Sequence, residues 1–245
     1  MAGILYVQEP VDRGLHVHPT WSLSLLGAWQ LTSTDRTVEV GKNGRRLFAL
    51  LAMRGACDRS YLSGVLWPDY SDPHAHGNLR ATLSRLHQRK VADVLQSSSG
   101  VLSLRAEVEV DVHRLLATAS AVLDGTLQAP DRSTLSELAT DDLLIGWYED
   151  WVLLERERLR QLRLHALEML SVQLLAAGAA TAAVEAAFAA VAVEPLRESA
   201  HRAAIRALLA EGNRAEALLQ LGRLRNLLLE ELGVEPSSLV TDLFQ

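Results

Sequence analysis

Residues 73–90 carry the side chains best suited to chemistry, and that chemistry is the recognition of bases and phosphates in nucleic acid. Ser71-Asp72-Pro73 has the pattern of a helix N-cap followed by a proline in the first turn, so a helix is predicted here. At about 100° per residue, one face of this helix is apolar and is expected to be buried; it holds Leu79, Leu83 and Leu86. A neighbouring stripe is polar and basic and consists of Asn78, Thr82, Arg85 and Arg89.

The exposed side chains of this predicted helix could bind specific groups on DNA. Arg85 can form two hydrogen bonds with a guanine edge, and Asn78 can do the same with adenine. Opposite the buried face lie small residues that would let the helix backbone sit deep in a major groove; they are Gly77, Ala81 and Ser84. Other basic side chains are better placed for phosphates, whose contacts fix the register of a protein on DNA; they are Arg80, Arg89 and Lys90.

A single arginine on a helix is usually a solvated surface charge, so the DNA interpretation depends on the whole segment. Two short apolar runs follow, at residues 94–96 and 101–104, on either side of the polar tetrapeptide Ser97-Ser98-Ser99-Gly100. This pattern predicts a hairpin whose tip could touch a minor groove or the DNA backbone through Ser98 and Ser99. Helix and hairpin together favour DNA binding over a merely solvated face.

The elements before this helix must position it. We expect a strand within residues 23–31, a second at 37–40, a helix at 44–54 and a short helix capped by Asp58 that ends at Trp67-Pro68. The order of strands, three helices and hairpin is that of an α+β winged helix-turn-helix preceded by a small sheet. We therefore expect a flexible arm at residues 1–20 and a winged-helix DNA-binding domain at residues 21–111.

The remaining residues, 112–245, are predicted to be all-α. Asp111 can cap a first helix that ends before Asp124-Gly125, and further helices are expected at about 149–177, 179–193, 197–210 and 214–231. The tetrapeptide Leu175-Ala176-Ala177-Gly178 returns 34 residues later as Leu209-Ala210-Glu211-Gly212. A 34-residue period of paired helices is the tetratricopeptide spacing, so a tetratricopeptide-like domain is predicted.

Charge is distributed unevenly along the 245 residues, whose formal net charge is −6. Residues 42–90 contain nine basic and three acidic residues, a net +6, whereas residues 113–245 contain twelve basic and nineteen acidic residues, a net −7. This asymmetry suggests a nucleic-acid module joined to a second functional unit. A single cysteine, no long apolar run and no secretion signal predict a cytoplasmic protein without a membrane partner.

Catalytic and metal-binding patterns are weak. His74-x-His76 beside Asp72 loosely suggests a metal site, but its spacing is not the i, i+4 pair of helical ligands and no cysteine supports it. The sequence lacks a phosphate-binding loop, a G-x-G-x-x-G run and a nucleophile elbow. Cys57 is interpreted as a packing residue, and Trp147, Tyr148 and Trp151 as core, with a binding groove as the secondary interpretation of this aromatic cluster. We expect no enzyme activity, no cofactor and no structural metal.

Several motifs carry a resemblance to a known family. They are Leu66-Trp67-Pro68, Asn78-Leu79-Arg80-Ala81-Thr82-Leu83-Ser84-Arg85-Leu86, Leu143-Leu144-Ile145-Gly146-Trp147-Tyr148-Glu149-Asp150-Trp151, Glu194-Pro195-Leu196-Arg197-Glu198-Ser199-Ala200-His201 and Glu231-Leu232-Gly233-Val234-Glu235-Pro236. Over nearly its full length the chain resembles the SARP-type activators, the antibiotic regulatory protein family. These join a response-regulator-type winged helix to a bacterial transcriptional activation domain.

The resemblance implies that protomers bind side by side to direct repeats near promoters, where they could form a homodimer on the DNA. It also implies contact with RNA polymerase and its sigma factor, and activation of biosynthetic gene clusters. The helix around Arg85 would read the major groove, the 97–100 tip would be the wing, and the helical half would serve protomer contacts and activation. Beside Arg85 would lie Asn78, Thr82, Ser84 and His87.

Two positions depart from the family pattern: His87 stands where a second arginine is common, and Ile145 where many relatives have proline. Histidine carries no permanent charge near neutral pH, so we expect weaker, mildly pH-dependent DNA binding. The alternative is a helical-repeat adaptor that binds protein and has weak or lost DNA affinity. Larger relatives carry further nucleotide-binding or phosphopeptide-binding domains, and none is expected here.

Overall fold

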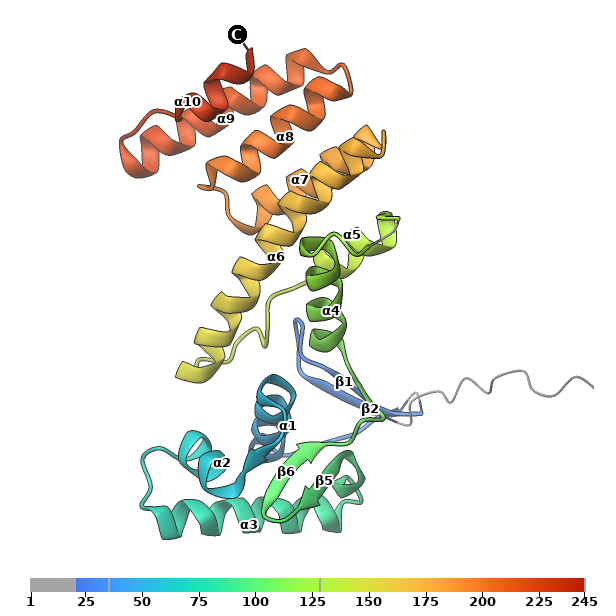
Figure 1. Cartoon of the computed structure of the whole chain (residues 1–245). Coiled ribbons are helices and arrows are strands. Elements are labelled where there is room, and N and C mark those ends of the chain that lie inside the picture. Colours follow the sequence, from blue (N-terminus) through green and yellow to red (C-terminus); the bar gives the residue numbers. More distant parts are fainter. Residues whose placement is uncertain (1–20, 35, 128, 245) are drawn as a thin grey trace, which may run out of the picture.

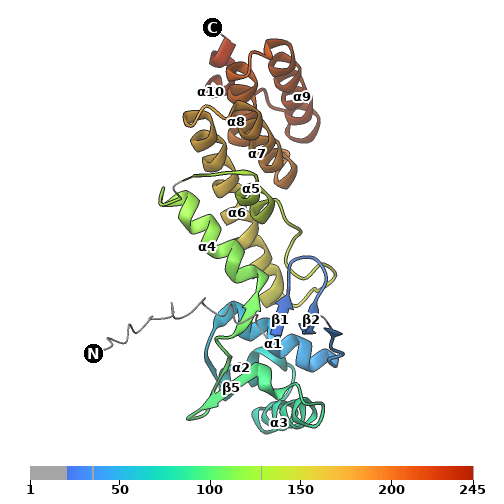
Figure 2. The same cartoon turned by 90° about the vertical axis from the view of Figure 1, so that its right-hand side faces the viewer.

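The computed structural model describes residues 21–34, 36–127 and 129–244. The predicted arm of residues 1–20 lies outside the described residues. Figures 1 and 2 show an elongated molecule with a small strand-containing end, a helical far end that holds the C-terminus, and helices α4 and α6 running between the two. Helix α3 lies at the outer edge of the strand-containing end.

A four-stranded sheet begins the described chain. It has the order β3-β2-β1-β7, with β1 antiparallel to β2 and parallel to β7. Its strands are β1 (Trp21–Ser24), β2 (Gln30–Ser33), β3 (Arg36–Thr37) and β7 (Val108–Val110). The prediction of one strand within residues 23–31 was wrong, because the chain reverses at Gly27, whose φ of +82° suits glycine. Of the strand predicted at 37–40, only Thr37 belongs to a strand, as the second residue of β3.

Three helices and a hairpin follow in the predicted order. The helices are α1 (Lys42–Arg54), α2 (Arg59–Leu66) and α3 (Asp72–Gln88). Asp58 caps α2 as expected, because its carboxylate accepts the amide N–H of Tyr61 at 2.8 Å. A short 3₁₀ turn, η1 (Ala92–Val94), leads to β5 (Leu95–Ser98) and β6 (Val101–Leu104). Strand β4 (Cys57–Asp58) pairs with β6, which ties the hairpin to the start of α2.

Helix α4 (Asp111–Leu123) connects the strand-containing end to the helical end. Asp111 is its first residue rather than its N-cap. The Asp111 carboxylate accepts the amide N–H groups of Leu25 and Leu26 at 2.9–3.0 Å as well as that of Val112 at 2.7 Å. One side chain therefore joins the end of β1 to the start of α4.

The helical end is a series of antiparallel neighbours. Its elements are α5 (Arg132–Leu138), α6 (Asp150–Ala176), α7 (Ala180–Val193), α8 (Glu198–Ala210), α9 (Arg214–Leu232), α10 (Ser238–Thr241) and η2 (Asp242–Phe244). The turns after α6 and α8 both place a glycine at positive φ, Gly178 at +78° and Gly212 at +89°, which are the residues matched by the 34-residue offset. Among the described residues, none of the helices combines the length and apolar character that crossing a bilayer would require.

One apolar core extends from the sheet through α1, α4 and α6 to α7 and α8. A smaller cluster lies under α9 and includes Ile205, Leu224 and Val240. Between the two ends, the segment of residues 143–149 packs against the β1–β2 turn, and here it is called the strap. Leu144 donates its N–H to the carbonyl of Leu25 at 2.8 Å, so the strap joins the β1–β2 turn to the start of α6.

Candidate nucleic-acid interface

Helix α3 is held on α1 and α2 by one buried stripe and presents the opposite side to solvent. The buried residues are Ala75, Leu79, Thr82 and Leu86. They follow the i, i+4, i+7, i+11 spacing of a single helix face. Leu83, which was expected in this stripe, is only partly buried. The whole stripe is therefore rotated toward Thr82 relative to the predicted one.

Thr82, which was predicted to lie on the exposed polar stripe, is buried instead. Its side chain is only 3 % exposed, and its hydroxyl donates to the carbonyl of Asn78 at 2.8 Å within the helix. The physical cause is the close approach of α1 at Gly44, where a Cβ atom would lie 2.9 Å from Cδ2 of Leu86. Asn78 itself is partly buried and lines the groove between α3 and the first turn of α1, beside Lys42.

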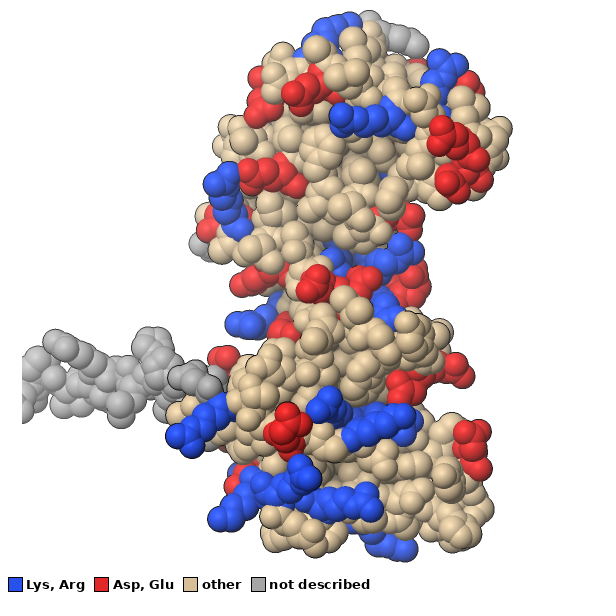
Figure 3. All heavy atoms as spheres, turned by 180° about the vertical axis from the view of Figure 1, so that it is seen from behind, with Lys and Arg blue, Asp and Glu red and all other residues tan. Residues whose placement is uncertain are grey.

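The remaining predicted residues of α3 lie on its exposed surface. They are Arg80, Ser84, Arg85, His87, Arg89 and Lys90. Among the described residues, Arg80 and Arg85 form no hydrogen bond or ion pair, and Arg89 donates only to the backbone carbonyl of Glu39 at 3.3 Å. Figure 3 shows Lys and Arg side chains gathered at this end of the molecule, whereas acidic and basic residues are mixed over the helical end. The outer face of α3 is therefore a cationic surface with free donors.

The hairpin beside α3 has a tighter tip than predicted. Its ladder continues to Ser98, and only Ser99 and Gly100 turn, with φ of +48° and +85°. Two central residues at positive φ form the kind of turn that fits the twist of paired strands. Ser98 and Ser99 are both exposed. The guanidinium of Arg59 donates to Oγ of Ser97 at 3.3 Å, which links α2 to the hairpin.

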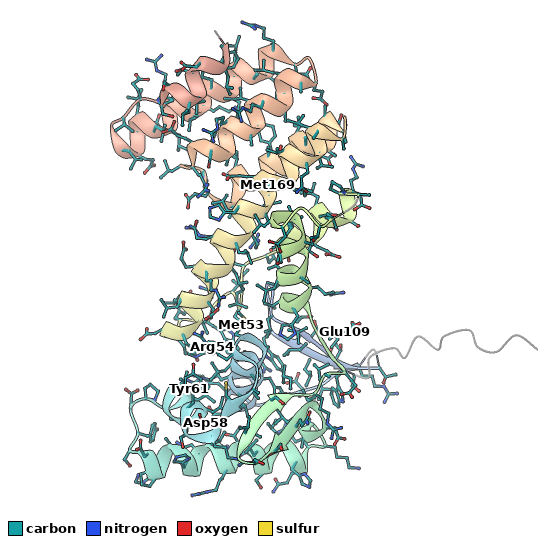
Figure 4. The ribbon with its side chains drawn as sticks, in the orientation of Figure 1. Met53, Arg54, Asp58, Tyr61, Glu109 and Met169 are labelled. Carbon is teal, nitrogen blue, oxygen red and sulfur yellow. The ribbon has the colours of Figure 1, made fainter. Side chains whose placement is uncertain are left out.

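Three of the nine basic residues counted in residues 42–90 are already paired with carboxylates. Arg46 forms an ion pair with Glu149 at 2.8 Å, and Arg54 pairs with Glu155 at 2.7 Å. Figure 4 labels Arg54 at the end of α1 that faces the foot of α6. The third, Arg45, lies 3.5 Å from a carboxylate oxygen of Glu39. Arg46 and Arg54 therefore join α1 to the start of α6. The sequence alone did not indicate these pairs, because the two partners lie about a hundred residues away in the chain.

Lys42 was missed by sequence reasoning. It is the first residue of α1, it is exposed, and it lines a groove with Arg85 and Arg89 of α3. Among the described residues it forms no ion pair. A basic residue directly after Gly41 at a helix start was the available signal, because free N–H groups and a lysine at that point both favour anions.

Two other groups from the sequence analysis have clear positions. Cys57 is buried in β4, and burial raises the pKa of its thiol, so it is not an activated nucleophile. Trp151 is buried and Trp147 partly buried, in keeping with packing roles. The core assignment of Tyr148 was wrong, because its side chain is 78 % exposed at the end of the strap.

Comparison with known proteins places this architecture in a family. The model of the bacterial transcriptional activator domain matches residues 95–245, more than half of the chain. The chain belongs to the SARP-type family of transcriptional activators. It is 33 % identical over 226 residues to the regulatory protein AfsR of Streptomyces coelicolor, and 29 % identical over 209 residues to AfsR of Streptomyces griseus.

These similarities cover 86 % and 81 % of this chain but only 22 % and 21 % of the two AfsR proteins, so the chain spans about a fifth of these relatives' length. The fold is shared with Mycobacterium tuberculosis EmbR, solved in complex with a low-affinity phosphopeptide. That match has a TM-score of 0.69 at 19 % identity and covers 91 % of this chain and 64 % of EmbR. The two share a small strand-containing N-terminal part followed by a mainly helical remainder.

Proposed function

We propose that this family member is a sequence-specific DNA-binding activator. Residues 21–111 form a winged helix-turn-helix in which α3 is the recognition helix and the β5–β6 hairpin is the wing. Residues 112–245 form a tetratricopeptide-like activation domain that recruits RNA polymerase through its sigma factor. Protomers lie side by side on direct repeats near promoters, and the regulated genes belong to a biosynthetic cluster.

One observation carries this proposal: within the part of the chain that the structure describes, Arg80 and Arg85 are unpaired on the outermost helix, whereas Arg46 and Arg54 form ion pairs with carboxylates of the helical half. Guanidinium groups that bind no protein carboxylate keep all their donors for phosphates and base edges. The fold thus separates its structural arginines from those that face solvent.

The positions on α3 suggest a division of roles. Arg85, near the middle of the exposed face, is proposed to read a guanine edge, with Ser84 and His87 beside it. Asn78 is proposed to act from the groove beside Lys42. The phosphate contacts are assigned to the side chains around this centre and to the wing; they are Lys42, Arg80, Arg89, Lys90, Ser98 and Ser99.

The helical half is proposed to act through its outer surfaces. The α6–α7 and α8–α9 hairpins repeat with the same glycine turn, and the buried faces are rich in alanine, which permits close helix packing. Side chains on the outside of this stack then contact neighbouring protomers and the polymerase.

Salt titration of binding to a selected DNA site tests the proposal. The logarithm of the association constant is expected to fall linearly with the logarithm of salt concentration, by roughly 0.9 per neutralised phosphate. Lys90→Gln should lower that slope by about one and weaken all sequences alike. Arg85→Ala should instead cost about 1–3 kcal/mol on the selected site only.

The matched control is Arg206→Ala, because this exposed arginine on α8 forms no hydrogen bond or ion pair among the described residues. It should change neither the slope nor the affinity. Salt-insensitive binding, or none, would favour the protein-binding adaptor instead.

A further inference from the structure

A second feature lies outside the outer face of α3. An open cleft of about 820 Å³ separates the start of α1 from the strap. One wall is formed by residues 39–42, 45 and 46 and by Arg89 directly after α3, and the other by residues 146–149. Clefts of this size at the junction of two structural units are common positions for small-molecule sites.

The α1 wall is rich in positive charge. It carries Lys42, Arg45, Arg46 and Arg89 with one carboxylate, Glu39, and the opposite wall adds a second carboxylate, Glu149. Glu39 is largely exposed and its ion pair with Arg45 is long, 3.5 Å, so it neutralises little. Lys42 has no ion pair among the described residues. The cleft as a whole therefore has a formal excess of two positive charges, and its α1 wall holds free donors.

The backbone at this wall also favours a bound anion. Helix α1 has thirteen residues and no acidic residue in its first turn, and no side chain of the described residues caps its start after Gly41. Its first N–H groups are left for an external acceptor. Gly41 and Lys42 both line the cleft.

The opposite wall is aromatic and held in place. Trp147 and Tyr148 line it, and Tyr148 is a large ring left in solvent. The guanidinium of Arg156 donates to the carbonyl of Trp147 at 3.0 Å and also to those of Leu143 and Leu144, so the strap is fixed to α6. A rigid aromatic surface opposite a cationic one fits a planar ring with an attached anion.

We propose that this cleft binds a small molecule of the nucleotide type, with its phosphate at Lys42 and the first turn of α1 and its ring against Tyr148. An anion here competes with Glu149 for Arg46, and that ion pair joins α1 to the foot of α6. The ligand therefore acts on the junction between the two halves, and through Arg89 on the edge of the α3 surface.

Calorimetric titration of the full chain with ADP, GDP and FMN tests this site, each ligand being taken to about 1 mM. At least one is expected to bind with a stoichiometry of one. Its affinity should fall about tenfold or more in Lys42→Gln and in Tyr148→Ala, both exposed residues whose loss spares the fold. The free nucleoside and inorganic phosphate should each bind more weakly than the intact ligand.

Matched controls are Arg80→Gln and Tyr61→Ala, an exposed cation and an exposed ring that do not line the cleft. They should leave the affinity unchanged. Failure of all three nucleotides to bind overturns the proposal, as does equal loss in the control variants. If none binds while Lys42→Gln and Tyr148→Ala both weaken duplex DNA, the cleft accommodates a DNA strand, which also overturns it.

Discussion

Replacing Arg54 with alanine is expected to destabilise the junction between the two halves more than replacing its partner Glu155 with glutamine. The two side chains form an ion pair of 2.7 Å between α1 and α6. They differ in burial, because the Glu155 side chain is only 4 % exposed whereas that of Arg54 is 36 % exposed. The pair is therefore asymmetric. Water can solvate Arg54 when Glu155 is replaced, but it cannot solvate Glu155 when Arg54 is replaced.

The magnitudes follow from this asymmetry. A buried charge that loses its partner costs about 3–5 kcal/mol, and the second cation near Glu155, Arg158 at 3.7 Å, reduces the cost of Arg54→Ala to about 2–3 kcal/mol. Glu155→Gln keeps the shape of the side chain and one hydrogen-bond acceptor, and it leaves the Arg54 guanidinium accessible to water. Its expected cost in the free energy of unfolding is therefore about 1 kcal/mol.

Urea unfolding followed by far-ultraviolet circular dichroism measures these differences. Arg158→Ala is the matched control, because this arginine pairs with the same carboxylate but is 74 % exposed. It should cost no more than about 0.5 kcal/mol. The reasoning is refuted if Glu155→Gln costs as much as Arg54→Ala, or if Arg158→Ala does.

Three further outcomes are expected. Burial lowers the pKa of His201 below its ordinary value of 6.5, so the unfolded chain takes up a proton there more readily than the folded state does. The free energy of unfolding should therefore fall as the pH drops below about 6.5, and it should fall less steeply in His201→Gln. Urea titrations at several pH values measure this difference. Arg163 is buried and donates to the carbonyls of Leu138 and Asp141, so Arg163→Ala should cost about 3 kcal/mol or more, and a loss below 1 kcal/mol in the same assay would contradict this. Gly100 has φ of +85°, so Gly100→Ala should lower the melting temperature by about 2–4 °C, and an unchanged value would show that the tip relaxes freely.

Local patterns predicted much of the fold because the signals were contained in short segments. The bounds of α3, the cap at Asp58 and the glycine turns at Gly178 and Gly212 follow from capping, periodicity and backbone freedom within a few residues. The hairpin at Gly27 was missed because its strands have four residues each, too short for alternation to separate one strand from two.

Contacts between distant segments were not predictable. Thr82 was placed on the DNA-facing stripe because a helical projection shows one helix alone, whereas its burial depends on the approach of α1 at Gly44. The arginines of α1 were counted as free charge for the same reason, since Glu149 and Glu155 belong to a different helical segment. Tyr148 was assigned to the core by its type, and its exposure depends on the path of the strap.

Selection from a random DNA library by the full chain at about 150 mM salt tests the central claim most directly. The account predicts enrichment of a short motif repeated at about one helical turn, lost in Arg85→Ala and retained in Arg206→Ala. Absence of enrichment, or a motif that Arg85→Ala selects equally well, would contradict the assignment of α3 as the surface that reads DNA.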